Sequence, residues 1–285
     1  MNDPKSARSI LLLSCKNQSG ILKDISDFVA KRGGNIVSLR HLAERNDNQL
    51  FLRVKWIGAN KNVCDVNNCS DFDNIRKKYQ PDFCRVTCST NVKTLGLFTS
   101  KTTHCLEKAL YHYSEDDINT KILLIIGNSR NCEKMSKYYG IPFYFIPTDE
   151  PDYEKKQLEL LKKHKVDFIG LARYMKILSP AFIAEYPNKI INIHHSFLPS
   201  FVGAKPYEEA YKKGVKLIGA TSHFVIPELD QGPIIEQDVS RVKEGFDAEN
   251  LAKQGRDVES EVFYFALRKY IEEKLIIYKN RVIVF

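Results

Sequence analysis

The chain of 285 residues contains no apolar run of the roughly 18 residues that a membrane-spanning helix requires. It also shows no apolar segment behind a basic start, because residues 1–8 are polar and the next apolar run, Ile10–Leu13, is short. A secretory signal is therefore not indicated. We expect a protein of the reducing cytoplasm that has no membrane partner.

Cysteine occurs at seven positions, an odd number, and its spacing does not repeat. The two closest pairs, Cys64 with Cys69 and Cys84 with Cys88, differ in spacing, whereas zinc sites commonly repeat a C-x2-C pair. No histidine cluster accompanies them, so we expect free thiols and no metal. Glycine-rich phosphate loops of the G-x-G-x-x-G or G-x-x-x-x-G-K type are also absent, which argues against nucleotide chemistry.

The formal net charge is +8, but the basic residues do not gather in one arm or tail. Lysine pairs are scattered along the chain, at Lys77-Lys78, Lys155-Lys156, Lys162-Lys163 and Lys212-Lys213. Nucleic-acid binders usually concentrate such charge on one face. The pattern favours a solvated surface that attracts an anionic substrate, with nucleic acid as the weaker alternative.

The first 89 residues carry the pattern of a small α/β domain. Apolar residues recur with the i, i+4, i+7, i+8 spacing of one helix face, at Ile21, Ile25, Phe28 and Val29. Gly33-Gly34 ends that helix. Strands are expected at residues 9–15, 35–42, 49–57 and 82–88, and a second helix at 71–79. The order is βαββαβ, and the polar residues 59–70 receive no assignment.

A linker around residues 89–93 leads into a second domain, so the domains are predicted as 1–89 and 90–285. Strands are expected at residues 94–99, 121–127, 142–146, 166–171 and 189–193, and helices at 105–113, 131–139 and 153–164. This alternation is typical of a Rossmann-like α/β fold with a mostly parallel, doubly wound sheet. Ligands of such sheets bind at the carboxyl ends of the strands.

Two motifs follow this pattern, Asn-Ile-His-His-Ser-Phe-Leu-Pro at residues 192–199 and Leu-Asp-Gln-Gly-Pro-Ile at 229–234. Asn192 and His194 stand two residues apart at the end of an expected strand, so both side chains project from one face. Asp230 adds a carboxylate at the head of a Gly-Pro turn. An amide donor, an imidazole and a carboxylate are the groups needed to attack a carbonyl.

Each member of this set also has an ordinary structural explanation. An Asn at a strand end commonly caps a turn, and an Asp before Gly commonly begins one. Taken together, Asn192, His194 and Asp230 favour a catalytic site. Two further histidines stay open: His195 either lines the water side of the site or points to the other face, and His223 either orients Asp230 or belongs to the core.

At these motifs the chain resembles the folate-dependent formyltransferase family. The family pattern is Asn-x-His-x-Ser-Leu-Leu-Pro followed by Leu-Asp-x-Gly-Pro, and the resemblance implies that Asn192, His194 and Asp230 are catalytic. It also implies that the segment after the strand at 166–171 forms the slot for the pterin ring of a folate. That segment supplies Arg173, Met175, Lys176, Ile177 and Leu178. A Met-Ile-Leu cluster by itself is more often core.

The N-terminal domain resembles an ACT domain, a module that often binds amino acids or mediates assembly. An ACT-like unit fused to this catalytic unit is the arrangement of the family's deformylase branch, which hydrolyses 10-formyltetrahydrofolate to formate and tetrahydrofolate. Four other stretches fit that branch, namely His104-Cys105-Leu106, the doubled His194-His195, Gly203-Ala204-Lys205-Pro206-Tyr207 and Gly255-Arg256-Asp257-Val258-Glu259. Ser19, where these deformylases usually have Pro, and the absence of a His in residues 242–246 depart from the pattern.

The resemblance implies hydrolysis of a formyl amide without a cofactor or metal. Asn192 and His194 would stabilise the tetrahedral oxyanion, and Asp230 would hold the imidazole charged or accept the proton of the attacking water. Two alternatives stay open. One is formyl transfer to an amine acceptor such as a glycinamide ribonucleotide, and the other is an amino-acid-responsive binding protein without catalysis.

The ACT-like unit carries two further expectations. Its short strands leave an edge that needs covering, so we expect a homo-oligomer assembled through sheet pairing. An amino-acid effector would bind at the turn after the first strand, formed by Asn17, Gln18, Ser19, Gly20 and Ile21. A purely structural role for that turn is an equal alternative.

Overall fold

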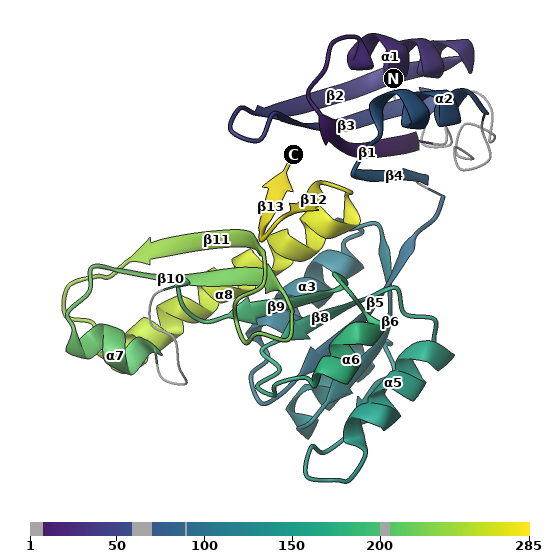
Figure 1. Ribbon diagram of the computed structural model, residues 1–285. Helices are drawn as coiled ribbons and strands as arrows, with labels where there is room; N and C mark the ends of the chain where they lie inside the picture. The colour runs from purple at the N-terminus through teal and green to yellow at the C-terminus, as the bar shows by residue number, and fades with distance from the viewer. Residues whose placement is uncertain (1–7, 59–69, 89, 200–205) are drawn as a thin grey trace. The chain divides into compact units, whose positions relative to one another are not determined.

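The computed structural model describes residues 8–58, 70–88, 90–199 and 206–285 (Figure 1). The described chain divides into two compact units. The first contains the described residues up to Val92 together with Glu273–Tyr278 and Ile283–Phe285, and the second contains Lys93–Glu272 and Lys279–Val282. Within the described residues no helix is both long enough and apolar enough to cross a membrane.

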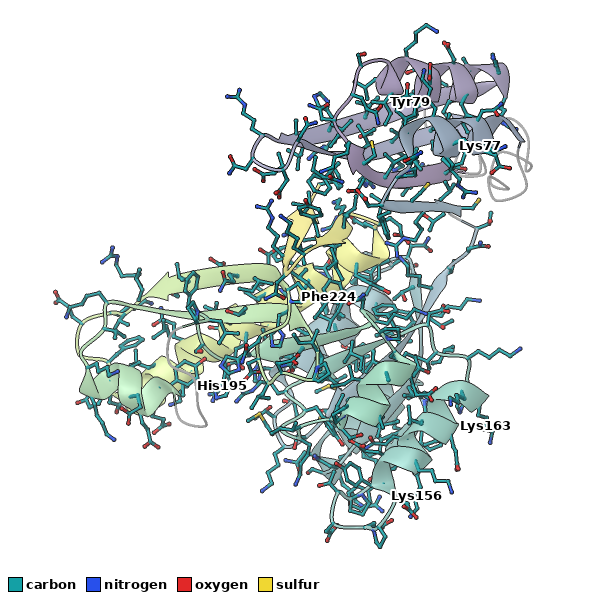
Figure 2. All side chains as sticks on the ribbon, in the orientation of Figure 1. Lys77, Tyr79, Lys156, Lys163, His195 and Phe224 are labelled. Atoms are coloured by element: carbon teal, nitrogen blue, oxygen red, sulfur yellow. The ribbon has the colours of Figure 1, made fainter. Side chains whose placement is uncertain are left out.

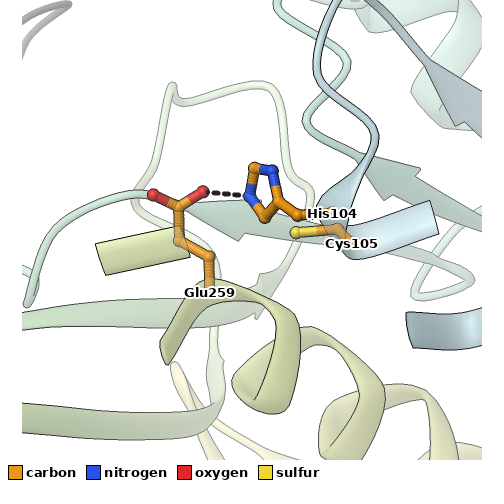
Figure 3. Close-up of side chains that lie close together, drawn as sticks. All are labelled: His104, Cys105 and Glu259. Atoms are coloured by element: carbon orange, nitrogen blue, oxygen red, sulfur yellow. Dashed lines mark hydrogen bonds and ion pairs between the residues drawn. The ribbon is translucent and has the colours of Figure 1, made fainter. Parts of the chain in front are cut away.

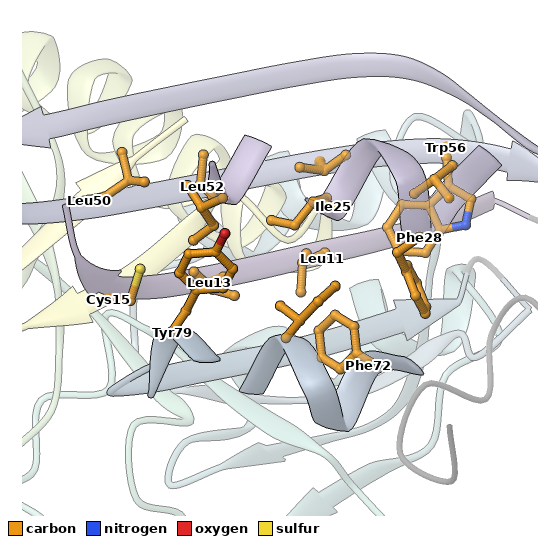
Figure 4. Close-up of a cluster of buried hydrophobic side chains, with 14 residues drawn as sticks. Leu11, Leu13, Cys15, Ile25, Phe28, Leu50, Leu52, Trp56, Phe72 and Tyr79 are labelled. Carbon is orange, nitrogen blue, oxygen red and sulfur yellow. The ribbon is translucent and has the colours of Figure 1, made fainter. Parts of the chain in front are cut away.

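The first unit has the βαββαβ order that the sequence predicts. Its elements are β1 (Arg8–Lys16), α1 (Ile21–Lys31), β2 (Gly34–Glu44), β3 (Gln49–Gly58), α2 (Ser70–Tyr79) and β4 (Phe83–Cys88). The strands form an antiparallel sheet in the order β2-β3-β1-β4. The four periodic apolar residues of α1 are buried among leucines of β1 and β3 and Phe72 of α2 (Figure 4). The helical periodicity therefore identifies the core face of α1 correctly.

A C-terminal hairpin completes the first unit, and the sequence pattern did not reveal it. Strands β12 (Leu275–Tyr278) and β13 (Arg281–Val284) pair with each other, and Ile276 packs with Leu12 and Phe51 in a second apolar cluster. Arg53 Nε donates a hydrogen bond of 2.7 Å to the carbonyl oxygen of Glu273. These contacts join the end of the chain to the N-terminal sheet, whereas the predicted boundary between residues 89 and 90 assigned the hairpin to the second domain.

The prediction of free thiols is wrong for Cys88, which is disulfide-bonded. Cys64 and Cys69 lie outside the described residues, so the prediction is not tested for them. Cys15, Cys84, Cys105 and Cys132 are free, as predicted. A disulfide depends on which thiols the tertiary fold brings together, and the spacing of cysteines along the chain does not reveal this.

The second unit is a mixed α/β domain around a seven-stranded sheet. The strands are β5 (Lys93–Thr99), β6 (Thr120–Gly127), β7 (Phe143–Phe145), β8 (Phe168–Ala172), β9 (Ile190–His194), β10 (Leu217–Phe224) and β11 (Ile234–Arg241). Their order is β11-β10-β9-β8-β5-β6-β7. The sheet is parallel from β9 to β7, and β10 runs antiparallel to both β9 and β11. The predicted mostly parallel sheet is confirmed.

Helices cover both faces of this sheet (Figure 1). They are α3 (His104–Ser114), the 3-10 helix η2 (Arg130–Cys132), α4 (Glu133–Tyr138), α5 (Tyr153–Lys163), α6 (Pro180–Glu185), α7 (Pro206–Lys212) and α8 (Ala248–Ile271). Residues of α5 and α6 share a core with Phe98 and Ile169 of the sheet. The long helix α8 packs against β9, β10 and β11 and against α3 and α7. The helix expected at 131–139 is divided into η2 and α4.

Candidate active site

A cavity of about 350 Å³ lies at the carboxyl ends of β8 and β9, where ligands of parallel sheets bind. Its lining includes all three residues predicted as catalytic, both supporting histidines and the whole predicted pterin segment. These are Asn192, His194, Asp230, His195, His223, Arg173, Met175, Lys176, Ile177 and Leu178. Residues predicted from separate stretches of sequence are therefore brought together in one site.

Asn192 and His194 stand at the end of β9, where strand alternation directs both side chains to one face. Asn192 pairs with His223 of the antiparallel strand β10, and Asn192 Nδ2 lies 3.3 Å from His223 Nε2. His223 Nδ1 lies 2.8 Å from the carbonyl oxygen of Phe224, so this nitrogen carries a proton. His223 Nε2 then either accepts from the Asn192 amide or, in the charged ring, donates to an acceptor.

Asp230 is held in the left-handed region, with φ 55°, in the turn that links β10 to β11. A non-glycine residue in this region costs about 1–2 kcal/mol, a strain that often accompanies a functional position. Packing requires a glycine at Gly232, two residues after Asp230, since a Cβ there would lie 1.7 Å from the carbonyl oxygen of Phe224. The Gly-Pro turn thus returns the chain tightly against β10 and carries the carboxylate over the end of β9.

Two histidines meet this carboxylate. His194 Nδ1 lies 3.1 Å from Asp230 Oδ2, and His223 Nε2 lies 3.5 Å from Asp230 Oδ1. The hydrogen bonds from His194 and His223 hold the pKa of Asp230 well below its usual range, against the opposing effect of burial. Asp230 is therefore a carboxylate at neutral pH, and it places the proton of His194 on Nδ1.

This tautomer leaves His194 Nε2 for a ligand. The His194 side chain is 7% exposed, and its Nε2 is buried without a hydrogen-bond partner among the described residues. A buried polar atom without a partner is costly, and such atoms in a cavity commonly contact a ligand. In the neutral ring Nε2 accepts a proton, and in the charged ring it donates one. His194 can therefore carry a proton between two groups bound in the cavity.

His195 is buried and lines the same cavity, although it directly follows His194 (Figure 2). Strand β9 ends at His194, so the alternation of strand side chains does not extend to the next residue. The His195 ring centroid lies 5.3 Å from that of His194 and 6.3 Å from that of Tyr207 in α7. The structure therefore places His195 beside the site and not on the opposite face of the strand.

The predicted pterin segment forms an apolar rim. Met175 and Ile177 are 53% and 67% exposed, which is unusual for large apolar side chains and excludes a core role for them. Leu178 is buried in the core shared by α5 and α6. The alternative that this segment contributes to the core is therefore correct for Leu178. Val225 and Leu229 face the same cavity from the loop before Asp230.

A buried ionic cluster borders the cavity and was not anticipated as a unit. Glu259 of α8 is 1% exposed, and its Oε2 lies 2.8 Å from His104 Nε2 (Figure 3) and 3.2 Å from Arg173 Nε. Tyr207 Oη donates a hydrogen bond of 2.5 Å to Glu259 Oε1. Two stretches of the sequence, around His104 and around Glu259, pointed to this region. They lie far apart along the chain, so their contact could not be predicted.

Three members of this region could hold a metal by donor type. Ligand atoms of His104, Cys105 and Glu259 lie within 4.8 Å of one another. The Glu259 carboxylate, however, already pairs with the Arg173 guanidinium, which would repel a cation. Burial, followed by the charge of Glu259, also raises the pKa of the Cys105 thiol. This environment favours the ion pair over a metal.

The predicted effector turn lies in the first unit. Asn17, Gln18, Ser19 and Gly20 are exposed, while Ile21 is buried at the start of α1. Gly20 has φ 90° and provides the left-handed turn before the helix. A hollow of about 200 Å³ in this unit is lined instead by residues of α1 and α2, including Asp24, Lys31 and Lys78. The structure does not bring the turn residues to that hollow.

Comparison with known proteins supports one family. The family described as formyl transferase matches residues 93–267. A formyltetrahydrofolate deformylase of Bacillus subtilis is 38% identical, over 99% of this chain and 95% of its own length, and one of Synechocystis is 36% identical over 96% and 97%. A crystal structure of a formyltetrahydrofolate deformylase from Pseudomonas syringae matches with TM-score 0.92 and 37% identity over 99% of this chain and 95% of that one.

A glycinamide ribonucleotide transformylase from Symbiobacterium toebii is also similar, with TM-score 0.65 and 28% identity. It covers 68% of this chain, whereas the chain covers 94% of the transformylase. The deformylases therefore match both units of the chain, and the transformylase matches about two thirds of it.

Proposed function

Since the chain belongs to the formyltetrahydrofolate deformylase family, we propose that its cavity hydrolyses 10-formyltetrahydrofolate to formate and tetrahydrofolate. The observation that carries this proposal is the buried His194 Nε2, which has no hydrogen-bond partner among the described residues and belongs to a cavity that Asn192 and Asp230 also line. A measurement of formate released in the absence of any amine tests it.

The cavity offers two kinds of contact to such a substrate. The faces of the flat pterin ring pack against the exposed apolar side chains of Met175 and Ile177, and the polar atoms at its edge are directed to backbone groups of the same segment. Arg173 and Lys176 add positive charge near an anionic folate. The N10-formyl group then lies beside Asn192 and His194 at the end of β9.

Hydrolysis begins when a water molecule attacks the formyl carbon. His194 Nε2 accepts the proton of the water, and Asp230 stabilises the resulting imidazolium through Nδ1. The Asn192 amide donates to the developing oxyanion, and the charged His194 serves as the second donor. His194 then passes its proton to N10 as the carbon–nitrogen bond breaks, so that tetrahydrofolate and formic acid are released, and the acid loses the second proton of the water to solvent as formate.

The other role considered for Asp230 was that of general base toward water. Its pKa lies well below the usual range, and each of its oxygens faces a histidine nitrogen. A carboxylate stabilised in this way is a weak base, so the imidazole is the better proton carrier. The proposed steps balance with water as the only co-reactant and require neither a cofactor nor a metal.

The alternative of formyl transfer to an amine uses the same three residues. The similarity of about two thirds of the chain to a glycinamide ribonucleotide transformylase is the reason to retain this alternative. The two reactions differ in products, because hydrolysis releases formate while transfer gives a formylated amine. The second alternative, a binding protein without catalysis, does not explain a complete Asn192, His194 and Asp230 set.

We also propose that the first unit is an ACT-like domain that assembles the chain into a homo-oligomer. Edge strand β2 exposes Val37 and Leu42, which are 48% and 46% accessible. An unpaired edge with apolar side chains favours pairing with a second copy. The turn at residues 17–21 is the proposed position of an amino-acid effector, with a structural role as the alternative.

Sedimentation velocity at micromolar concentration is expected to show an oligomer for the unchanged chain. Replacing both Val37 and Leu42 with lysine is expected to shift the protein to monomer, because like charges would then face each other across the edge. Val239→Lys, at a 41% exposed site on β11, is the matched control and is expected to leave assembly unchanged. A monomer for the unchanged chain would refute this assembly.

A further inference from the structure

Arg173 forms a polar wall of the cavity, beside the exposed apolar side chains of the same segment. The residue follows β8, adopts φ 58° and directs its guanidinium toward α8, where Nε lies 3.2 Å from Glu259 Oε2. Its side chain is only 14% exposed, and Nη1 is buried without a hydrogen-bond partner among the described residues. A strained backbone and a buried cation at the cavity wall indicate a function beyond solvation.

Glu259 holds the guanidinium of Arg173 in place. Hydrogen bonds from His104 and Tyr207 occupy its two oxygens, and the carboxylate is almost completely buried. Burial would raise the pKa of Glu259, but the His104 hydrogen bond and the Arg173 charge outweigh it and lower that pKa. The carboxylate is therefore charged, and the guanidinium beside it has little freedom to move away.

Tyr207 is itself held by close packing against α8. A Cβ added to Gly255 would lie 2.1 Å from Tyr207 Oη, so the glycine is what admits the phenol ring. Burial and the neighbouring Glu259 raise the pKa of Tyr207, so its hydroxyl remains a donor. The wall is thus supported by α3, α7 and α8, through His104, Tyr207 and Glu259.

The wall adjoins the reacting residues. Leu171 of β8 pairs with Asn192 of β9, so Arg173, two residues further, lies at the carboxyl edge of the sheet near the level of His194. His195 connects the two regions, with its ring 5.3 Å from that of His194 and 6.3 Å from that of Tyr207. The space beside His194 is therefore bounded by His195 and Arg173.

We propose that Arg173, positioned by Glu259, restricts the nucleophile of the site to water and is the residue that prevents formyl transfer to an amine. This proposal rests on the proposed deformylase function. The guanidinium fills the space that an amine substituent would need, and its fixed positive charge repels the ammonium form in which most amines exist at neutral pH. Water is small and neutral, and it can donate to His194 while accepting from the guanidinium.

The two outcomes differ in one bond. In hydrolysis the oxygen of water bonds to the formyl carbon, the bond from that carbon to N10 breaks, N10 gains one proton of the water, and formate leaves as the other proton passes to solvent. In transfer the amine nitrogen bonds to the same carbon and loses a proton, which again reaches N10. The reacting residues are the same in both, so removal of the wall should change the acceptor without removing the chemistry.

The test compares products of the unchanged chain and Arg173→Gly with 10-formyltetrahydrofolate and excess glycinamide. Glycine suits the positive φ of this position, so the variant adds no backbone strain. Mass spectrometry would quantify N-formylglycinamide against formate. We expect formate alone from the unchanged chain, and from Arg173→Gly formylated amine as roughly a tenth or more of the product.

Lys165→Gly is the matched control, because it also replaces a cation at a position of left-handed backbone, with φ 55°, but Lys165 is exposed and does not line the cavity. It is expected to yield no formylated amine. Tyr207→Phe, which removes one hydrogen bond to Glu259, provides a milder variant and is expected to move the product ratio in the same direction.

Formate as the only product of both Arg173→Gly and Tyr207→Phe would overturn the proposal for Arg173 and leave the deformylase function intact. Formylated amine from Lys165→Gly at the same level would also overturn it. If the unchanged chain released no formate, the proposed function would fail instead, so the two failures are distinguishable.

Discussion

Replacing Asp230 with asparagine is expected to lower kcat for formate release by about 10³–10⁴-fold. The substitution keeps the size of the side chain but removes the negative charge that stabilises the imidazolium of His194 across 3.1 Å. Asparagine also presents an amide that can turn its NH2 group toward Nδ1 and favour the other tautomer of His194. Steady-state kinetics with 10-formyltetrahydrofolate would measure the loss.

Asp116→Asn is the matched control for this variant. Asp116 is exposed and has φ 57°, close to the φ of 55° at Asp230, so the same chemical change occurs in the same backbone conformation away from the cavity. Asparagine tolerates this left-handed region. We expect turnover of Asp116→Asn to match that of the unchanged chain, and a similar turnover for Asp230→Asn would refute the role assigned to this carboxylate.

The same variant also has an effect on stability whose pH dependence can be predicted. The folded state lowers the pKa of Asp230, so the carboxylate stabilises the fold above the pKa of an unfolded Asp, about 4, and loses this contribution as pH falls toward the folded pKa. The difference in free energy of unfolding between the unchanged chain and Asp230→Asn should therefore be largest above pH 5. Urea titrations at several pH values should show it shrink below pH 4.

Replacing His194 with alanine is expected to lower kcat by about 10³-fold or more. The change removes the proton carrier together with the second donor to the oxyanion. His194→Gln separates these functions, because glutamine can donate a hydrogen bond but cannot take up a proton at neutral pH. If proton transfer is the larger contribution, the glutamine variant should be nearly as slow as the alanine variant.

His41→Ala serves as the control for the histidine variants, since His41 is exposed on β2 of the first unit. Its turnover should equal that of the unchanged chain. A loss of less than about tenfold in His194→Ala would contradict the proposed mechanism, because that loss is below the contribution expected of a single positioned proton carrier.

Much of the fold could be predicted because its signals are local. The spacing of Ile21, Ile25, Phe28 and Val29 identified α1, since burial of one helix face requires apolar residues at those intervals. Alternating strands and helices likewise indicated the parallel sheet. The C-terminal hairpin could not be predicted, because its short strands are stabilised by the surface that they cover, which includes Leu12 and Phe51.

The candidate site was partly predictable for a different reason. Asn192 and His194 are neighbours on one strand, and the Gly-Pro turn after Asp230 is a strong local signal, so the positions of all three could be anticipated. The ion pair of Arg173 with Glu259 could not be predicted, because one partner follows β8 and the other lies on α8, and neither stretch of sequence indicates the other. The catalytic roles, the ACT-like assignment and the effector turn remain predictions.

The most direct measurement is incubation of the purified chain with 10-formyltetrahydrofolate and no amine, with formate and tetrahydrofolate quantified together. We expect the chain to release both products in equimolar amounts. The release should be lost in Asp230→Asn and retained in Asp116→Asn. Absence of formate, with turnover only after an amine such as glycinamide ribonucleotide is added, would contradict this expectation and identify a transferase.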